Sequence, residues 1–218
     1  MISTSQLLLI LAALIYAGSP SVVALVVTRG RVLRGPWAAR PPWPLLAAAL
    51  LGPLVVVLTS RLDGARLELG PLALVVAIGA PLGEELGWRG ALNPWLERRY
   101  GWLAGALLTG LAWAAWHLPL TYVNGGLAFF PELAAGLIAA SVVIAFLHER
   151  SGHSLLVPLL AHASLNLGLV RASDVGTWTR LLVWTALAVA SAAVRARAAR
   201  RSTPAHPGTA APASPPRP

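Results

Sequence analysis

Seven apolar stretches divide this chain, and each is long enough to cross the hydrocarbon core of a bilayer. A transmembrane helix needs about 20 predominantly apolar residues, with a range of roughly 17 to 25. Of the 218 residues, 56% are hydrophobic and 11% are charged, whereas a soluble domain carries about a quarter of its residues as charged side chains. The sequence therefore predicts an all-α fold, a polytopic transmembrane helical bundle of about seven spans. The expected spans cover residues 5–27, 43–60, 70–90, 101–123, 132–148, 153–170 and 177–194.

The positive charge follows the connections between these spans. All 17 basic residues are arginines, and the net charge is +9. If alternate connections are cytoplasmic, the outer side holds only Arg61, Arg66, Arg171 and Arg180. The inner side then holds the other 13, namely Arg29, Arg31, Arg34, Arg40, Arg89, Arg98, Arg99, Arg150, Arg195, Arg197, Arg200, Arg201 and Arg217. By the positive-inside rule we expect a plasma-membrane protein with its N-terminus outside and its C-terminus cytoplasmic. The arginines are then partners of the lipid bilayer, and no nucleic acid is implied.

Both ends of the chain carry their own signals. No basic residue precedes the first apolar stretch and four arginines follow it, which is the wrong order for a cleaved signal peptide, so we expect a retained anchor. After Arg201 the composition changes to Pro, Ala, Thr, Gly and Ser, which predicts a disordered tail over residues 202–218.

Two of the eight acidic residues, Glu84 and Glu85, lie deep within an expected span. A carboxylate at that depth costs several kcal/mol, so such residues usually have protein partners and a function. Arg89 follows Glu85 at i+4, and we interpret this pair as a structural ion pair. Glu84 points about 100° away around the helix. Without a local partner it is the candidate for chemistry.

The histidines divide in the same way. His148, His153 and His206 fall in connections or in the tail and are expected to be solvated, whereas His117 and His162 fall inside spans. Asn166 follows His162 at i+4, so both can project from one helix face. A rise of 1.5 Å per residue places Glu84, His117, His162 and Asn166 roughly 15 to 24 Å from the cytoplasmic turns, so the four can share one layer.

This set of side chains favours water as the nucleophile. The chain has no cysteine, which excludes a thiol-protease mechanism. Glu84 would be the general base, His117 would share that role, and His162 and Asn166 would donate hydrogen bonds to a developing oxyanion. The competing interpretation is a zinc site built from two histidines and a carboxylate. There is no HExxH motif, the histidines belong to different spans, and asparagine is a poor zinc ligand, so we predict no cofactor.

Three short motifs resemble a known family. Residues 84–90 (EELGWRG) reproduce an EExxxR motif, residues 113–119 (WAAWHLP) are similar to the second motif, and residues 162–166 (HASLN) match HxxxN. The chain thus resembles the CPBP family of intramembrane proteases, also called the Abi family, which includes the type II CAAX prenyl endopeptidases. At Trp113 the eukaryotic members of the family have Phe, and the larger ring would narrow the cavity.

The resemblance implies an intramembrane glutamic endopeptidase, often described as a metallopeptidase, with a polar cavity that opens toward the cytosol and the membrane. Glu84 and His117 would activate water, His162 and Asn166 would form the oxyanion hole, and Glu85 and Arg89 would support the site. The implied organisation is two N-terminal helices with a basic cytoplasmic loop (1–69), a protease-like core (70–170), and a last helix with a basic end (171–201). The absence of lysine and the minimal layout suggest a bacterial member. The expected partner is a peptide or protein substrate at the membrane.

Two non-enzymatic alternatives stay open. A membrane immunity protein or chaperone-like scaffold would use the same motifs to hold the bundle together. A transporter would use Glu84 as a proton carrier, although the sequence has no internal repeat of the kind that marks many transporters.

Overall fold

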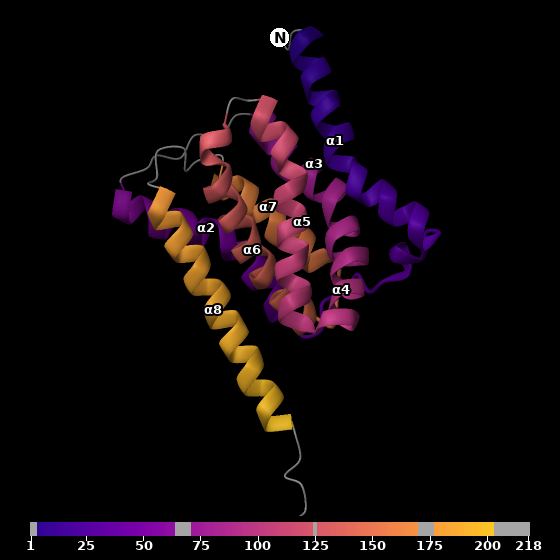
Figure 1. Cartoon of the computed structure of the whole chain (residues 1–218), viewed down its shortest axis with the longest axis vertical. Coiled ribbons are helices and arrows are strands. Elements are labelled where there is room, and N and C mark those ends of the chain that lie inside the picture. The colour runs from indigo at the N-terminus through magenta and orange to yellow at the C-terminus, as the bar shows by residue number, and fades with distance from the viewer. Residues whose placement is uncertain (1–3, 64–70, 124–125, 170–176, 203–218) are drawn as a thin grey trace, which may run out of the picture.

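The computed structural model describes residues 4–63, 71–123, 126–169 and 177–202, and all regular structure in these ranges is helical (Figure 1). The predicted all-α fold is confirmed. The α-helices are α1 (Thr4–Thr28), α2 (Trp43–Asp63), α3 (Pro71–Gly87), α4 (Asn93–Tyr100), α5 (Trp102–Val123), α6 (Phe130–Arg150), α7 (Leu156–Leu169) and α8 (Thr177–Ser202). Two short 3₁₀ helices, Arg31–Arg34 and Leu127–Phe129, and a π-helical turn, Trp88–Leu92, complete the described part of the chain.

The π-helical turn joins α3 and α4 into one continuous rod. Gly87 and Asn93, which flank the turn, both keep right-handed helical angles, and the Asn93 amide donates to the Trp88 carbonyl. Pro94 lacks an N–H group, and in a regular α-helix its ring would collide with the carbonyl of Gly90. The wider turn before Pro94 relieves that collision. With this rod counted once, the described residues form seven helical rods close to the seven predicted stretches.

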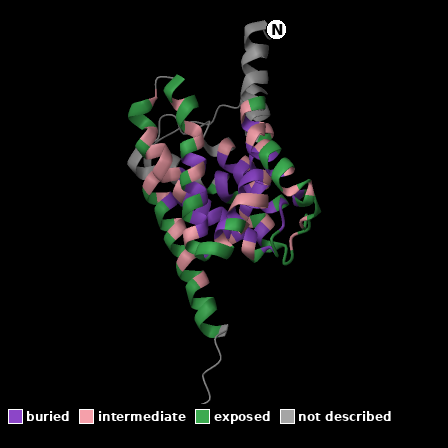
Figure 2. Ribbon diagram, turned by 45° about the vertical axis from the view of Figure 1, so that its right-hand side comes forward, coloured by how far each residue is buried: buried purple, intermediate pink, exposed green. Residues whose placement is uncertain are grey.

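Three of the described helices are long and apolar enough to cross a membrane, namely Trp102–Val123, Leu127–Arg150 and Leu181–Arg201. Further described segments, Ile15–Thr28 among them, are apolar but shorter. Exposed residues lie along the outside of the bundle and along α8 (Figure 2). Many of them are large and apolar; Val189 on α8, for example, is 63% exposed. Such an apolar exterior suits lipid rather than water, and the chain is an integral membrane protein.

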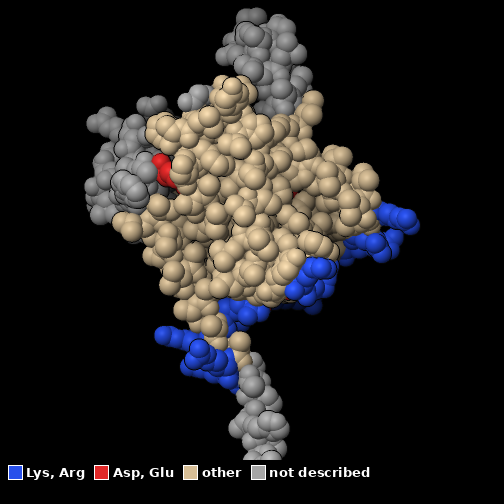
Figure 3. All heavy atoms as spheres, viewed as in Figure 1, with Lys and Arg blue, Asp and Glu red and all other residues tan. Residues whose placement is uncertain are grey.

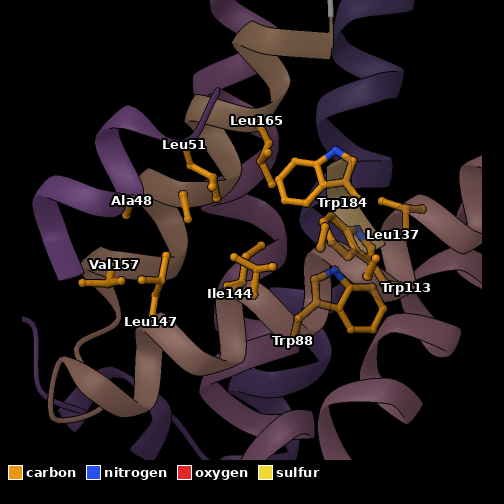
Figure 4. Close-up of a cluster of buried hydrophobic side chains, with 14 of the residues drawn as sticks. Ala48, Leu51, Trp88, Trp113, Leu137, Ile144, Leu147, Val157, Leu165 and Trp184 are labelled. Atoms are coloured by element: carbon orange, nitrogen blue, oxygen red, sulfur yellow. The ribbon is translucent and has the colours of Figure 1, made fainter. Parts of the chain in front are cut away.

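Helix α6 lies at the centre of the packing. It contacts α5, α7, α8 and α2, and most of its residues from Leu137 to His148 are buried. The buried apolar cluster that surrounds it includes Ile144, Val157, Trp113 and Trp184 (Figure 4). Trp113 is only 2% exposed, so a large aromatic ring occupies the middle of the bundle beside the deep carboxylates.

Small residues allow the backbones of α1 and α3 to approach closely. A Cβ atom added to Gly83 would lie 2.6 Å from the carbonyl oxygen of Ala17, and one added to Gly87 would lie 2.6 Å from the Cβ of Pro20. Both distances are shorter than real Cβ contacts, so this close approach needs glycine at both positions. Glycines four residues apart are a common means of packing helices in membranes.

The arginines that are visible in Figure 3 gather toward one end of the molecule. The connections at that end are tied together, because the Arg40 amide donates to the Ser151 carbonyl (3.0 Å) and the Leu155 amide to the Pro36 carbonyl (2.8 Å). The Arg195 guanidinium pairs with Glu149 at 2.9 Å. The predicted inner connections 28–42 and 149–152 therefore lie on the same side, together with the end of α8.

Two sequence predictions about this end are wrong. Arg89 was placed among the inner-side arginines, but its side chain is fully buried in the bundle against Glu85. His148 was expected to be solvated, but it is 4% exposed because the segment between α1 and α2 covers the turn between α6 and α7. His153 is exposed, as predicted. His206 lies outside the described residues.

Candidate active site

The adjacent carboxylates Glu84 and Glu85 are both buried near the end of α3, with 3% and 0% of their surface exposed. Successive residues of an α-helix point about 100° apart. The two side chains therefore meet different neighbours, and they have different partners.

Glu85 lies in a charged network. Its Oε1 atom accepts hydrogen bonds from Arg89 Nη1 at 2.7 Å and from His162 Nδ1 at 2.8 Å. The predicted contact between Glu85 and Arg89 is present, and His162 joins it from α7, 77 residues further along the chain. Because a carboxylate can only accept, Nδ1 of His162 carries a proton. The ring is thereby oriented, with Nε2 at its opposite edge.

Glu84 is held by two tryptophans instead of a cation. Its Oε2 atom accepts from Trp113 Nε1 at 2.7 Å and from Trp88 Nε1 at 3.2 Å. The expectation that Glu84 has no local partner is wrong, because Trp88 is at i+4 on the same helical rod and its indole N–H is a hydrogen-bond donor. Neutral donors satisfy the buried oxygen and leave the negative charge of Glu84 uncompensated by an ion pair.

His117 lies one helical turn after Trp113 on α5. Its Nδ1 atom is 2.9 Å from the backbone carbonyl oxygen of Trp113, and the side chain is half-buried. A carbonyl oxygen only accepts, so Nδ1 is the protonated nitrogen and Nε2 keeps its lone pair in the neutral ring. The tautomer thus makes Nε2 the basic atom of His117.

The Trp113 ring is the point at which these groups meet. Its centroid lies 4.8 Å from that of His162 and 6.0 Å from that of His117, in edge contacts, and the Arg89 guanidinium carbon lies 4.8 Å from it. Together with the bond from Trp113 Nε1 to Glu84, these contacts bring α3, α5 and α7 together at one level.

A cavity of about 370 Å³ opens beside this cluster. His162, Asn166 and Trp113 line it, together with residues of α6 and α8 such as Leu137 and Trp184. Neither Glu84 nor His117 belongs to its lining. The structure therefore brings Glu84, His117 and His162 together around Trp113, and it places Asn166 with His162 at the cavity.

The described residues do not form a metal site. In these ranges no three His, Cys, Asp or Glu side chains are grouped as metal ligands. Glu84 Oε2 is already bound by two indole N–H groups, and Glu85 Oε1 by a guanidinium and an imidazole. These donors bind one oxygen of each carboxylate, and the buried Glu85 Oε2 has no hydrogen-bond partner among the described residues.

The chain matches a known protein family over about half of its length. Residues 66–168 match the family model described as type II CAAX prenyl endopeptidase Rce1-like. This match and the relative described next support a CPBP/CAAX protease family for the chain. All six residues of the three motifs lie within the matched range.

One curated relative supports this assignment. The CAAX-family chain is 27% identical over 110 residues to a protein named CAAX prenyl protease 2 from Methanococcus maripaludis. The alignment covers 44% of this chain and 39% of that protein. The chain thus matches about two fifths of the relative's length.

The hydrogen bonds of Trp88 and Trp113 to Glu84 were not predicted from the sequence. Trp113 was expected to narrow the cavity because of its large ring, and it does line the cavity. Its hydrogen bond to Glu84 was not expected, because the partners are 29 residues apart on different helices. The contact between Trp88 and Glu84 could have been predicted, because an indole N–H at i+4 from a buried carboxylate is a candidate hydrogen-bond donor.

Proposed function

We propose that this protein is an intramembrane endopeptidase that cleaves a peptide bond of a membrane-associated or C-terminally processed peptide. Three observations support the proposal: the family assignment, the cluster of ionisable side chains within the bundle, and the cavity beside it. The observation that carries most weight is the pair of indole donors on Glu84, because they hold a buried carboxylate in place without neutralising it.

In the proposed reaction, water attacks the carbonyl carbon of the scissile peptide bond. Glu84 accepts a proton from that water, and its Oε1 atom is suited to this because both tryptophans bind Oε2. His117 orients the water through Nε2. The proton passes to the nitrogen of the leaving amine as the C–N bond breaks, which yields a carboxylic acid and an amine. General base catalysis of this kind contributes about 10²- to 10⁴-fold to a rate.

His162 and Asn166 form the proposed oxyanion hole. The Asn166 amide and the Nε2–H of a protonated His162 would each donate to the tetrahedral oxygen, an interaction worth roughly 3 to 4 kcal/mol per donor in a dry site. Glu85 supports this role, because its hydrogen bond to Nδ1 orients the His162 ring. Glu85 and Arg89 are thus positioning residues.

The proposed enzyme needs no metal, and the zinc-dependent alternative is open to a direct test. Among the described residues no three His, Cys, Asp or Glu side chains are grouped as metal ligands, which favours the metal-free reaction. The zinc version predicts that stoichiometric metal copurifies with the protein and that chelators abolish cleavage.

One observation favours a non-catalytic scaffold. Glu84 is 3% exposed and does not line the cavity that contains His162 and Asn166. A scaffold would need the polar network only for packing. In that case a Glu84→Gln protein would fold normally and fully restore the phenotype of a deletion strain.

We further propose that the basic end faces the cytoplasm. The gathering of arginines at one end supports this orientation, since positively charged connections stay on the cytoplasmic side. The N-terminus would then lie outside, and the expected setting is a bacterial plasma membrane.

The deciding experiment uses the purified protein in detergent and a library of peptides, with cleavage sites mapped by mass spectrometry. Wild-type protein is expected to cleave a subset of the library, and Glu84→Ala to cleave none of it. Equal cleavage by the two proteins would exclude the proposed mechanism. Comparison of membrane peptides from wild-type and Glu84→Ala strains would then identify the natural substrate.

A further inference from the structure

A groove separates α1 from the rod formed by α3, the π-helical turn and α4. The two backbones touch at Gly83 and Gly87, where neither glycine leaves room for a side chain. Beyond that contact they diverge and enclose a groove of about 560 Å³, which runs toward the basic end. The groove shares no lining residue with the cavity that Asn166 lines.

The walls of the groove are apolar and follow helical spacing. Val23 and Val27 of α1 face it from one side, and they are 60% and 72% exposed. Leu92 and Trp95 face it from the other rod, and Trp95 is 51% exposed. Residues three or four positions apart share one helix face. Each helix therefore contributes a continuous apolar stripe whose side chains are open to the surroundings.

Two arginines complete the lining at the basic end. Arg31 comes from the 3₁₀ helix that follows α1, and Arg98 comes from the end of α4. Both are exposed, and neither forms an ion pair with a carboxylate of a described residue. Arg31 donates through Nε to the Thr28 carbonyl at 3.0 Å, which leaves its two terminal nitrogens for another acceptor.

We propose that this groove binds one anionic phospholipid of the surrounding bilayer. The phosphate lies between Arg31 and Arg98, because guanidinium groups bind phosphate oxygens through charge-assisted and often paired hydrogen bonds. One acyl chain follows the stripe formed by Val23, Val27 and Leu92. The Trp95 indole lies at headgroup depth, where tryptophan is enriched in membrane proteins.

The dimensions of the groove agree with an acyl chain. The α1 residues that line it run from Ser19 to Thr28, which corresponds to about 14 Å along the helix. At the inner end Trp116 donates from Nε1 to the Ser19 hydroxyl at 3.2 Å, so α1 and α5 are joined there. The neighbouring Trp88 is the residue whose indole N–H binds Glu84. The end of the acyl chain thus contacts a residue of the candidate active site, although lipid binding itself does not depend on the proposed peptidase activity.

Native mass spectrometry of the full chain in detergent micelles tests this proposal. Phosphatidylglycerol is titrated into delipidated protein, with phosphatidylcholine as the zwitterionic comparison. One phosphatidylglycerol is expected to bind more tightly than phosphatidylcholine. Arginines near a membrane surface contribute about 1 kcal/mol each toward anionic lipid, so the double variant Arg31→Gln/Arg98→Gln should bind this lipid about 30-fold more weakly.

A matched control removes the same charge elsewhere. Arg99 and Arg150 are also exposed and outside the groove lining, so Arg99→Gln/Arg150→Gln should keep wild-type affinity. Ala91→Trp places a large ring in the groove and should abolish binding without removing a charge. Equal weakening by the two arginine double variants, equal affinity for the two lipids, or wild-type binding by Ala91→Trp would each overturn the proposal. An apolar peptide could also displace phosphatidylglycerol from the groove. If it did so equally well in wild type and in Arg31→Gln/Arg98→Gln, the groove would be assigned to peptide instead of lipid.

Discussion

Glu84 and Glu85 are neighbours on α3, yet their carboxylates have hydrogen-bond partners of different charge. Glu85 faces α7 and shares its bound oxygen between a guanidinium and an imidazole. Glu84 faces α5, and its bound oxygen accepts only two neutral indole N–H groups. Both kinds of donor stabilise a carboxylate, but a cation also offsets its charge, whereas neutral donors orient the carboxylate without adding an opposite charge. The comparison suggests that Glu85 serves the structure and Glu84 the reaction.

The largest expected effect comes from removing the proposed base while keeping its shape. Glu84→Gln retains an oxygen that can accept from both tryptophans, so folding should be unchanged. Peptide cleavage should fall by up to about 10⁴-fold, the upper range for loss of a general base. Thermal unfolding in detergent and cleavage rates are measured side by side, with Glu97→Gln on α4 as the control. Loss of stability with normal cleavage would reverse the roles assigned to the two carboxylates.

The converse change is Arg89→Met, which leaves the Glu85 carboxylate buried without its guanidinium. Breaking a buried ion pair on one side costs about 3 to 5 kcal/mol. Chemical denaturation in detergent should show this loss, whereas Glu84→Gln should not. The double variant Glu85→Gln/Arg89→Met should regain part of the stability, since it removes both charges. If Arg89→Met were as stable as wild type, the ion pair between Glu85 and Arg89 would not contribute to the free energy of unfolding.

Asn166→Ala tests the cavity side of the candidate site. Loss of one oxyanion donor lowers kcat by about 10²- to 10³-fold, with little change in KM, because the interaction is made in the transition state. Steady-state kinetics on a cleaved peptide measure both constants. A rise in KM with unchanged kcat would show that Asn166 only binds substrate.

The two indole donors on Glu84 should differ in effect. Trp113→Phe keeps an aromatic ring and removes the 2.7 Å hydrogen bond, so kcat should fall about 10- to 150-fold, in line with the roughly 1.5 to 3 kcal/mol of a bond to a charged group. Trp88→Phe removes the longer bond of 3.2 Å and should cost only a few-fold. The double variant measures whether the two donors act on one carboxylate. A lowered melting temperature with unchanged kcat would show that both tryptophans serve packing and do not contribute to the reaction.

The smallest expected effect is that of metal removal. Because the bound oxygens of Glu84 and Glu85 are occupied by nitrogen donors, extended dialysis against EDTA should leave the cleavage rate unchanged. Elemental analysis of the purified protein accompanies the assay. Loss of activity that zinc restores would favour the metal-dependent alternative.

Much of this architecture could be predicted from local patterns. The apolar stretches predicted the helical rods because their length and hydropathy are local properties. The contact between Glu85 and Arg89 could be predicted because i and i+4 side chains meet on any α-helix. Arg89 was nevertheless also assigned to a cytoplasmic connection, since the sequence alone does not say where a helix leaves the bilayer.

Contacts between helices could not be predicted in this way. The hydrogen bond from Trp113 to Glu84 and the one from His162 to Glu85 join residues 29 and 77 positions apart. Such contacts depend on the rotation of each helix about its own axis, which small residues such as Gly83 and Gly87 set through close packing. The same limit explains His148, whose burial depends on a distant segment that covers it.

Hydropathy, arginine placement and motif spacing predict an all-helical membrane protein and select Glu84, His117, His162 and Asn166 as candidate site residues. The partner of each buried carboxylate, and the groove between α1 and α4, follow instead from the packing of the helices. The physical reason is that hydrophobicity and helical periodicity act within a segment. The environment of a buried charge is instead set by which helix faces it, and that depends on how the whole bundle packs.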